Sequence, residues 1–210
     1  MLSFSSAANL HPTPTSSLSC TGRAAGLPPW PGCRDAASGR SRPFSIDAVA
    51  RQADVARMTV YYQFGSKIGL LEALCDYLAA QGGMDQLPTA FRQTDPLNAL
   101  AEYIAVFGRF WNSDRLVTRR LRGLAALDSD FEQVIRARDE RRRQGLSVIL
   151  QRLVEQYGQT LAEAFDETVN ILYTLTSFET FDTLAGPTRS LEDVTPTVQR
   201  LARAALSLEG

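Results

Sequence analysis

Histidine is almost absent from the chain, and cysteine is sparse. The 210 residues include one histidine, His11, in a stretch rich in Pro, Ser and Gly, and three irregularly spaced cysteines, Cys20, Cys33 and Cys75. A single histidine in such a stretch supports neither a Ser-His-Asp arrangement nor a histidine metal site. An odd, irregular set of cysteines indicates neither a disulfide framework nor a metal cluster.

Glycine-rich phosphate loops and dinucleotide fingerprints are missing as well. Carboxylate pairs such as Glu163 and Glu167 lie at helical spacing, which a solvated helix face explains most simply. The sequence therefore predicts no catalytic residue, no metal and no cofactor, and we do not expect an enzyme.

Long apolar runs and a strong net charge are also absent. No apolar run approaches about 18 residues, so we expect no transmembrane helix and no membrane partner. Lys and Arg number 22 against 23 Asp and Glu, and 44% of residues are hydrophobic. This composition is typical of an ordinary globular protein, for which the cytoplasm is the default location. The near-neutral chain has no overall attraction to nucleic acid, although a local basic patch can still bind DNA.

Residues 1–43 differ in composition from the rest of the chain. They contain six prolines, many Ser and Gly, and four arginines against a single acid, Asp35. No helical period is present, and no basic segment precedes an apolar core as it does in a secretory signal. This composition predicts a disordered tail.

Two short helices and the start of a third are predicted within residues 44–80. The helical period of 3.6 residues is present in Ile46, Val49, Ala50 and Ala53, and Ser45 stands where an N-cap belongs. A second helix is predicted from about residue 56 to residue 64, and a third follows Gly65-Ser66. The side chains expected to be buried on the third helix are Leu70, Leu71, Leu74 and Tyr77. Such a pattern is typical of a helix-turn-helix, whose second helix enters the DNA major groove.

The same segment resembles the N-terminal signature of TetR-family transcriptional regulators. The resemblance is carried by Ala48-Val49-Ala50, Val55, the run Thr59 to Lys67 (TVYYQFGSK) and Leu70-Leu71. It implies an all-α protein, with a homeodomain-like helix-turn-helix unit followed by an α-helical domain for effector binding and dimerisation at residues 95–208.

One helix of the family pattern is missing. TetR regulators place an amphipathic helix directly before the position of Ser45, where it covers the other two helices. Here Pro31-Gly32 and Ser38-Gly39 interrupt any helix. We therefore expect the DNA-binding domain at residues 44–80 to be truncated, and residues before about Phe44 to come from another reading frame. Translation of the upstream DNA in the other two frames tests this expectation.

Seven residues of the motif and its flank are candidate DNA contacts: Ser45, Arg57, Met58, Thr59, Tyr61, Tyr62 and Lys67. Arg57 begins the recognition helix, and its guanidinium group matches O6 and N7 of guanine. Lys67, in the first turn of its helix, suits a backbone phosphate. The resemblance implies the same contact for one or both tyrosines, although Tyr61 can equally be half core. Thr59 offers a methyl group to thymine or a hydroxyl group to phosphate, Met58 offers only apolar contact, and Ser45 can reach the backbone.

The residues after the Gly82-Gly83 linker predict further helices, because no segment alternates with period two. Asp95-Pro96 begins a helix with an inward stripe made of Leu97, Leu100, Ile104, Phe107 and Trp111. Later helices are expected from Asp114, with Leu116 and Leu127 inward; from Ser129 to Tyr157; from Thr160 to Gly186; and from Ser190 or Thr195 to Leu208, with Leu201 inward. The polar middle of the 129–157 helix is expected to be a solvated face.

An effector pocket and a homodimer formed by the last two helices are implied by the resemblance. The candidate lining residues are Phe107, Phe110, Trp111, Leu124, Tyr173 and Phe178, which would suit a small apolar ligand. Core packing explains the same residues. Polar side chains that could orient a ligand are Asn170, Thr174, Thr176 and Ser177.

Two functions follow from these patterns. The first is a TetR-like repressor that binds a palindromic operator in double-stranded DNA and responds to a small-molecule effector. The second is a dimeric small-molecule-binding or interaction protein that has lost DNA binding.

Overall fold

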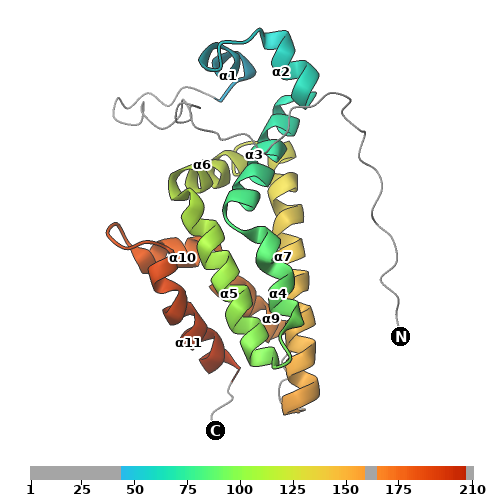
Figure 1. Cartoon of the computed structure of the whole chain (residues 1–210), viewed down its shortest axis with the longest axis vertical. Helices are drawn as coiled ribbons and strands as arrows, with labels where there is room; N and C mark the ends of the chain where they lie inside the picture. The colour runs from blue at the N-terminus through green and yellow to red at the C-terminus, as the bar shows by residue number, and fades with distance from the viewer. Residues whose placement is uncertain (1–43, 159–164, 207–210) are drawn as a thin grey trace, which may run out of the picture. The chain divides into compact units, whose positions relative to one another are not determined.

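The computed structural model describes residues 44–158 and 165–206, and every regular element in those two ranges is a helix. In chain order (Figure 1) the elements are α1 (Ile46–Gln52), α2 (Arg57–Phe64), α3 (Lys67–Gln81), η2 (Met84–Gln86), α4 (Leu87–Arg92), α5 (Pro96–Ser113), α6 (Arg115–Ala125), α7 (Ser129–Tyr157), α9 (Phe165–Leu175), α10 (Phe178–Ala185), η3 (Glu192–Val194) and α11 (Thr195–Ala205). The predicted all-α class is confirmed. The tail predicted at residues 1–43 lies outside the described residues. No described helix is long and apolar enough to cross a membrane.

Helices α1, α2 and α3 form a helix-turn-helix unit with a small core. Its fully buried side chains are Ile46, Ala50, Val60 and Leu70, with Phe44, Val49, Tyr61 and Phe64 packed half-buried around them. The side chain of Ser45 accepts a hydrogen bond from the Ala48 amide (3.2 Å), and that of Ser66 accepts one from the Gly69 amide (3.0 Å). Both caps satisfy amides that have no partner within the helix, and so fix where α1 and α3 begin.

Helix α3 continues from this unit and packs against α5 and α7. Its buried stripe is made of Leu70, Leu71, Leu74, Cys75 and Leu78. Tyr77, predicted to be buried, is exposed, because the inward stripe passes through Leu74 and Leu78 and leaves Tyr77 facing solvent.

Helix α5 lies at the centre of the larger helical domain. It packs against α3, α4, α7 and α11, and its predicted stripe is buried through Leu100, Ile104, Phe107 and Trp111. A Cβ atom at Gly145 of α7 would lie 2.7 Å from the hydroxyl oxygen of Tyr103. Glycine at that position therefore lets α7 approach α5 closely.

The helix predicted from Thr160 to Gly186 is two helices where the structure describes it; Thr160 itself lies outside the described residues. Helix α9 ends at Leu175 and α10 begins at Phe178. The break is held by the indole N–H of Trp111, which donates to the Thr176 carbonyl oxygen (3.0 Å), and by Ser177, whose side chain caps α10. Apolar residues continue the helical period on both sides, so the periodicity alone does not reveal the break.

Three leucines predicted to face inward are exposed: Leu116, Leu127 and Leu201. In α6 the inward positions belong to Val117 and Leu121, and Leu127 lies beyond the last turn. In α11 they belong to Val198 and Ala202. Leu208, also expected inward, lies outside the described residues.

Candidate functional site

The turn between α1 and α2 is tight and carries a residue in a left-handed conformation. Asp54 has φ of 53°, and the Val55 amide donates to the Ala50 carbonyl oxygen (3.0 Å). Asp tolerates this region better than most residues, because its short side chain can form local hydrogen bonds. The turn therefore keeps the geometry that a helix-turn-helix requires without a glycine.

Helix α2 presents most of its surface to solvent. Val60 alone is buried among its residues, whereas Met58 and Tyr62 are 56% and 86% exposed. Thr59 and Gln63 are exposed on the same helix, and Tyr61 is half-buried against the small core. One side of α2 is therefore left free of the core and open to solvent.

Arg57 is exposed but held in place. Its Nε lies 3.3 Å from Oδ1 of Asp47 on α1, and one terminal nitrogen donates to the hydroxyl group of Tyr61 (3.2 Å). The hydrogen bond to Tyr61, followed by the charge of Asp47, raises the pKa of Arg57. Contacts of this kind orient the guanidinium group on the face that α2 presents.

Lys67 is paired with an acidic residue that is distant in the sequence. Its Nζ lies 2.8 Å from Oδ2 of Asp128, and the other carboxylate oxygen of Asp128 accepts from the Phe131 amide at the start of α7 (3.2 Å). This ion pair lowers the pKa of Asp128. A phosphate contact by Lys67 therefore competes with Asp128.

A cavity of about 250 Å³ lies beneath α3 in the helical domain. Phe107, Phe110 and Trp111 line it, together with Cys75 and Leu78 of α3. Burial raises the pKa of the Cys75 thiol. The cavity thus touches the helix that begins directly after the recognition helix.

The other three aromatic or apolar candidates lie elsewhere. Phe178 is buried in the core with its ring 5.8 Å from that of Trp111. Tyr173 lies under the guanidinium group of Arg142, 4.1 Å from ring centroid to Cζ. Leu124 is half-buried on α6, outside the cavity lining. The polar candidates Asn170, Thr174, Thr176 and Ser177 are also outside that lining.

The middle of α7 is solvated only in part: Arg136, Glu140 and Arg141 are exposed as its composition predicts, but one side of the helix is buried. Arg142 is only 4% exposed and donates to the Tyr173 carbonyl oxygen (2.6 Å) and the Thr176 hydroxyl oxygen (2.9 Å). Asp139 accepts from Arg142 (3.3 Å) and, with both oxygens, from Arg122 of α6 (2.9 and 3.1 Å). Arg142 and Asp139 are three positions apart, but their other partners lie 17 to 34 positions away, so no local pattern in the sequence reveals those contacts.

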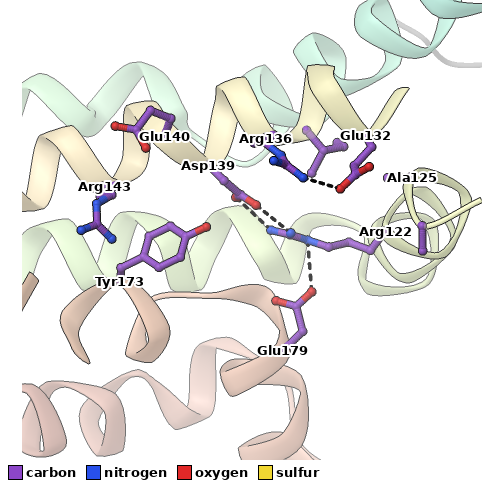
Figure 2. Close-up of a pocket in the computed structure, with 11 residues that line it drawn as sticks. Arg122, Ala125, Glu132, Arg136, Asp139, Glu140, Arg143, Tyr173 and Glu179 are labelled. Carbon is purple, nitrogen blue, oxygen red and sulfur yellow. Dashed lines mark hydrogen bonds and ion pairs between the residues drawn. The ribbon is translucent and has the colours of Figure 1, made fainter. Parts of the chain in front are cut away.

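A second, open hollow of about 560 Å³ lies on the other side of the Arg122–Asp139 pair. Figure 2 shows Arg122 reaching between Asp139 and Glu179, with Arg136 pointing toward Glu132. These charges are paired with one another, so the hollow has the character of a solvated ion-pair network.

Arg138 links α7 to α3. Its guanidinium group lies 2.8 Å from Oδ1 of Asp76 and donates to the Glu72 carbonyl oxygen (3.4 Å). Arg138 also lines the apolar cavity. The cavity wall and the helix that carries the helix-turn-helix are therefore directly connected.

Comparisons with known proteins fit the geometry of this N-terminal unit. Residues 42–74 match the family described as "Bacterial regulatory proteins, tetR family". A search of the solved structures matches the crystal structure of a TetR family transcriptional regulator, PfmR from Thermus thermophilus, with a TM-score of 0.55 and 23% sequence identity. That match covers 80% of this chain and 90% of the other. No curated protein matches the chain.

The family match supports a TetR-type helix-turn-helix unit at residues 42–74. The family match spans the turn at Asp54, the recognition helix α2 and the first half of α3. At 23% identity the structural match bears on the fold alone, and it extends that fold to the helical domain. The TetR-type unit and its helical domain meet at α3.

Proposed function

We propose that the chain is a TetR-type transcriptional repressor that binds a palindromic operator as a homodimer and releases it when a small molecule binds. The observation that carries the proposal is the exposed face of α2, where Arg57, Met58 and Tyr62 stand clear of the core within a segment that matches the family. In the proposed complex Arg57 contacts a base edge and Tyr62 the phosphate backbone. No reaction is proposed for the chain.

Two ion pairs support communication between the helical domain and the DNA-binding unit. Asp128 at the start of α7 holds Lys67 at the start of α3, and Arg138 of α7 holds Asp76 further along α3. A shift of α7 relative to α3 would therefore move the helix-turn-helix. In a two-fold dimer such a movement changes the separation of the two recognition helices, and so the affinity for both half-sites together.

Apolar side chains on the last helices support a homodimer. Ile171 of α9 and Leu201 of α11 are exposed, and α9 packs against α11. A two-fold interface that pairs these helices with their copies would bury both side chains and place the two recognition helices for a palindrome.

DNA binding is tested by fluorescence anisotropy with the upstream region of the gene, over a salt series. We expect sequence-specific binding that weakens with salt, because phosphate contacts release counterions. Arg57→Ala should weaken specific binding about tenfold or more, since a bidentate base contact contributes about 1–3 kcal/mol. Arg92→Ala is the matched control, because Arg92 is an exposed arginine at the end of α4, away from α2.

Absence of binding at low salt would contradict the proposal. It would favour instead a dimeric small-molecule-binding or interaction protein that has lost DNA binding. Two ion pairs favour this alternative, because each neutralises a cation that DNA binding would need. They join Arg57 to Asp47 and Lys67 to Asp128.

A further inference from the structure

The apolar cavity has one strongly cationic wall. Among its lining residues in the described part of the chain, four carry guanidinium groups, namely Arg122, Arg138, Arg141 and Arg142, and one, Asp139, carries a carboxylate. Arginine stays protonated in proteins. The lining therefore carries an excess of positive charge beside an otherwise apolar space.

Arg142 is a buried cation that shares its single carboxylate partner with another arginine. The only carboxylate within ion-pair distance among the described residues is Asp139, at 3.3 Å. Both oxygens of Asp139 also accept from Arg122 at shorter distances. The Nε atom of Arg142 is buried and has no acceptor among the described residues. A buried charge without a full counter-charge is costly, so a second anion at this point would be favourable.

Arg138 adds a second donor at the same end. Its Nε is also buried without an acceptor among the described residues, and its carboxylate partner, Asp76, has a side chain that is 68% exposed. An exposed ion pair is weak. A ligand anion in the cavity can therefore compete for Arg138.

The rest of the cavity suits an apolar body of limited size. Phe110, Trp111, Leu121 and Met84 supply apolar lining, with the guanidinium group of Arg122 5.5 Å from the centroid of the Trp111 ring. A cavity of about 150 Å³ lined by apolar side chains holds a benzene molecule. The 250 Å³ present here can therefore hold an aromatic ring with a short chain, or an aliphatic chain of similar volume.

We propose that the cavity binds a small apolar carboxylate, with the carboxylate against Arg142 and Arg138 and the ring or chain against Phe110 and Trp111. This inference deepens the proposed function, since it names the chemical class of the effector. It also gives the effector a route to the DNA-binding unit, because an anion that draws Arg138 away from Asp76 loosens α3 from α7.

The test uses three probes of matched shape and different charge on the full chain without DNA: 3-phenylpropionate, its neutral amide and the corresponding amine, 3-phenylpropylamine. Binding is measured by isothermal titration calorimetry. We expect the carboxylate to bind at least tenfold more tightly than the amide, and the amine to bind most weakly. Binding of the amide or the amine as tightly as the carboxylate would overturn the proposal, and so would the absence of binding by all three.

Two variants locate the anion. Arg142→Gln and Arg138→Gln should each weaken carboxylate binding about tenfold and leave amide binding nearly unchanged. Arg136→Gln is the control, because it removes a charge from α7 outside the cavity, where Arg136 pairs with Glu132. If Arg142→Gln fails to fold, as circular dichroism would reveal, Arg138→Gln decides. Unchanged carboxylate binding in Arg138→Gln would then overturn the proposal.

The result is separable from the proposed function. Carboxylate binding that persists in a chain unable to bind its upstream DNA would support the ligand class and contradict the repressor. Specific DNA binding without any preference for the carboxylate would support the repressor and contradict the ligand class.

Discussion

Lys67 illustrates how a single side chain can serve two partners. In the free protein it is paired with Asp128 at 2.8 Å, and in the proposed complex it meets a DNA phosphate. Asp128 has a second task, because its other oxygen caps the N-terminus of α7. Asparagine is about as good an N-cap as aspartate, so the charge can be removed while the cap is kept.

Asp128→Asn is therefore expected to strengthen DNA binding severalfold. It frees Lys67 for a phosphate and should make the dependence of log K on log salt steeper by about one phosphate contact. Anisotropy over a salt series measures both quantities. Lys67→Gln removes the cation instead of its partner, so the dependence of log K on log salt should become shallower. Equal slopes in the two variants would show that Lys67 does not reach a phosphate.

Cys75 offers a chemical readout of the cavity. Burial raises the pKa of its thiol, so the thiolate fraction at neutral pH is smaller than that of a free cysteine, and its attack on a disulfide reagent should be slow. In a Cys20→Ser, Cys33→Ser background, 3-phenylpropionate is expected to slow the reaction further, because Cys75 lines the cavity. The rate of thiol release with a chromogenic disulfide measures this. An unchanged rate at saturating ligand would place the ligand elsewhere.

For single residues, contacts between near neighbours in the sequence could be predicted, and ion pairs between distant residues could not. The Ser45 cap follows from neighbours within a few positions. The pair between Lys67 and Asp128 joins residues 61 positions apart, so it exists only once α3 and α7 have packed together.

Asp182 connects two helices. On α10 it accepts from Arg115 (2.5 Å) and Arg119 (2.8 Å) of α6. Burial alone would raise the pKa of Asp182, but the hydrogen bonds from the two arginines outweigh it, and the pKa is lowered. A carboxyl group with a lowered pKa stabilises the fold above its unfolded-state pKa. This stabilisation is lost as the pH falls through the lower pKa of the folded state.

Asp182→Asn is expected to lower the free energy of unfolding by about 1.5–3 kcal/mol at pH 7, the usual contribution of a hydrogen bond to a charged group. The difference from the wild type should shrink as the pH falls below about 4. Urea unfolding at several pH values measures it, and Asp166→Asn, an exposed site on α9, is the control. A difference that does not depend on pH would contradict the ionic origin.

The helical period of apolar residues predicted most helices. It did not predict helix ends that depend on packing against another helix. The stripe of α5 and the full length of α7 were predictable, because apolar residues recur over many turns. The break between α9 and α10 was not, since it depends on Trp111 reaching the Thr176 carbonyl group from another helix. The buried Arg142 was not predictable either, because a run of charged residues normally indicates a solvated face.

The assembly of the whole molecule can be tested through its exposed apolar side chains. Ile171→Arg and Leu201→Arg are each expected to convert the proposed homodimer into a monomer, because a charge at the centre of an apolar interface is left without a partner. Operator binding should then fall more than tenfold, since each monomer reads only one half-site. Light scattering coupled to size-exclusion chromatography measures the mass.

Val148→Arg is the control for this experiment, since Val148 is exposed on α7, a helix outside the proposed interface. A dimer that survives both interface variants would place the interface elsewhere.

Arg142 connects three helices through separate atoms. Its carbonyl oxygen accepts from Tyr103 of α5, and its guanidinium group donates to the Tyr173 carbonyl oxygen of α9, while its own backbone belongs to α7. Opening any one of these helices would expose a buried cation or break its hydrogen bonds. The three helices are therefore expected to unfold as one cooperative unit, leaving local fluctuation to the small helix-turn-helix core, where partial opening costs least.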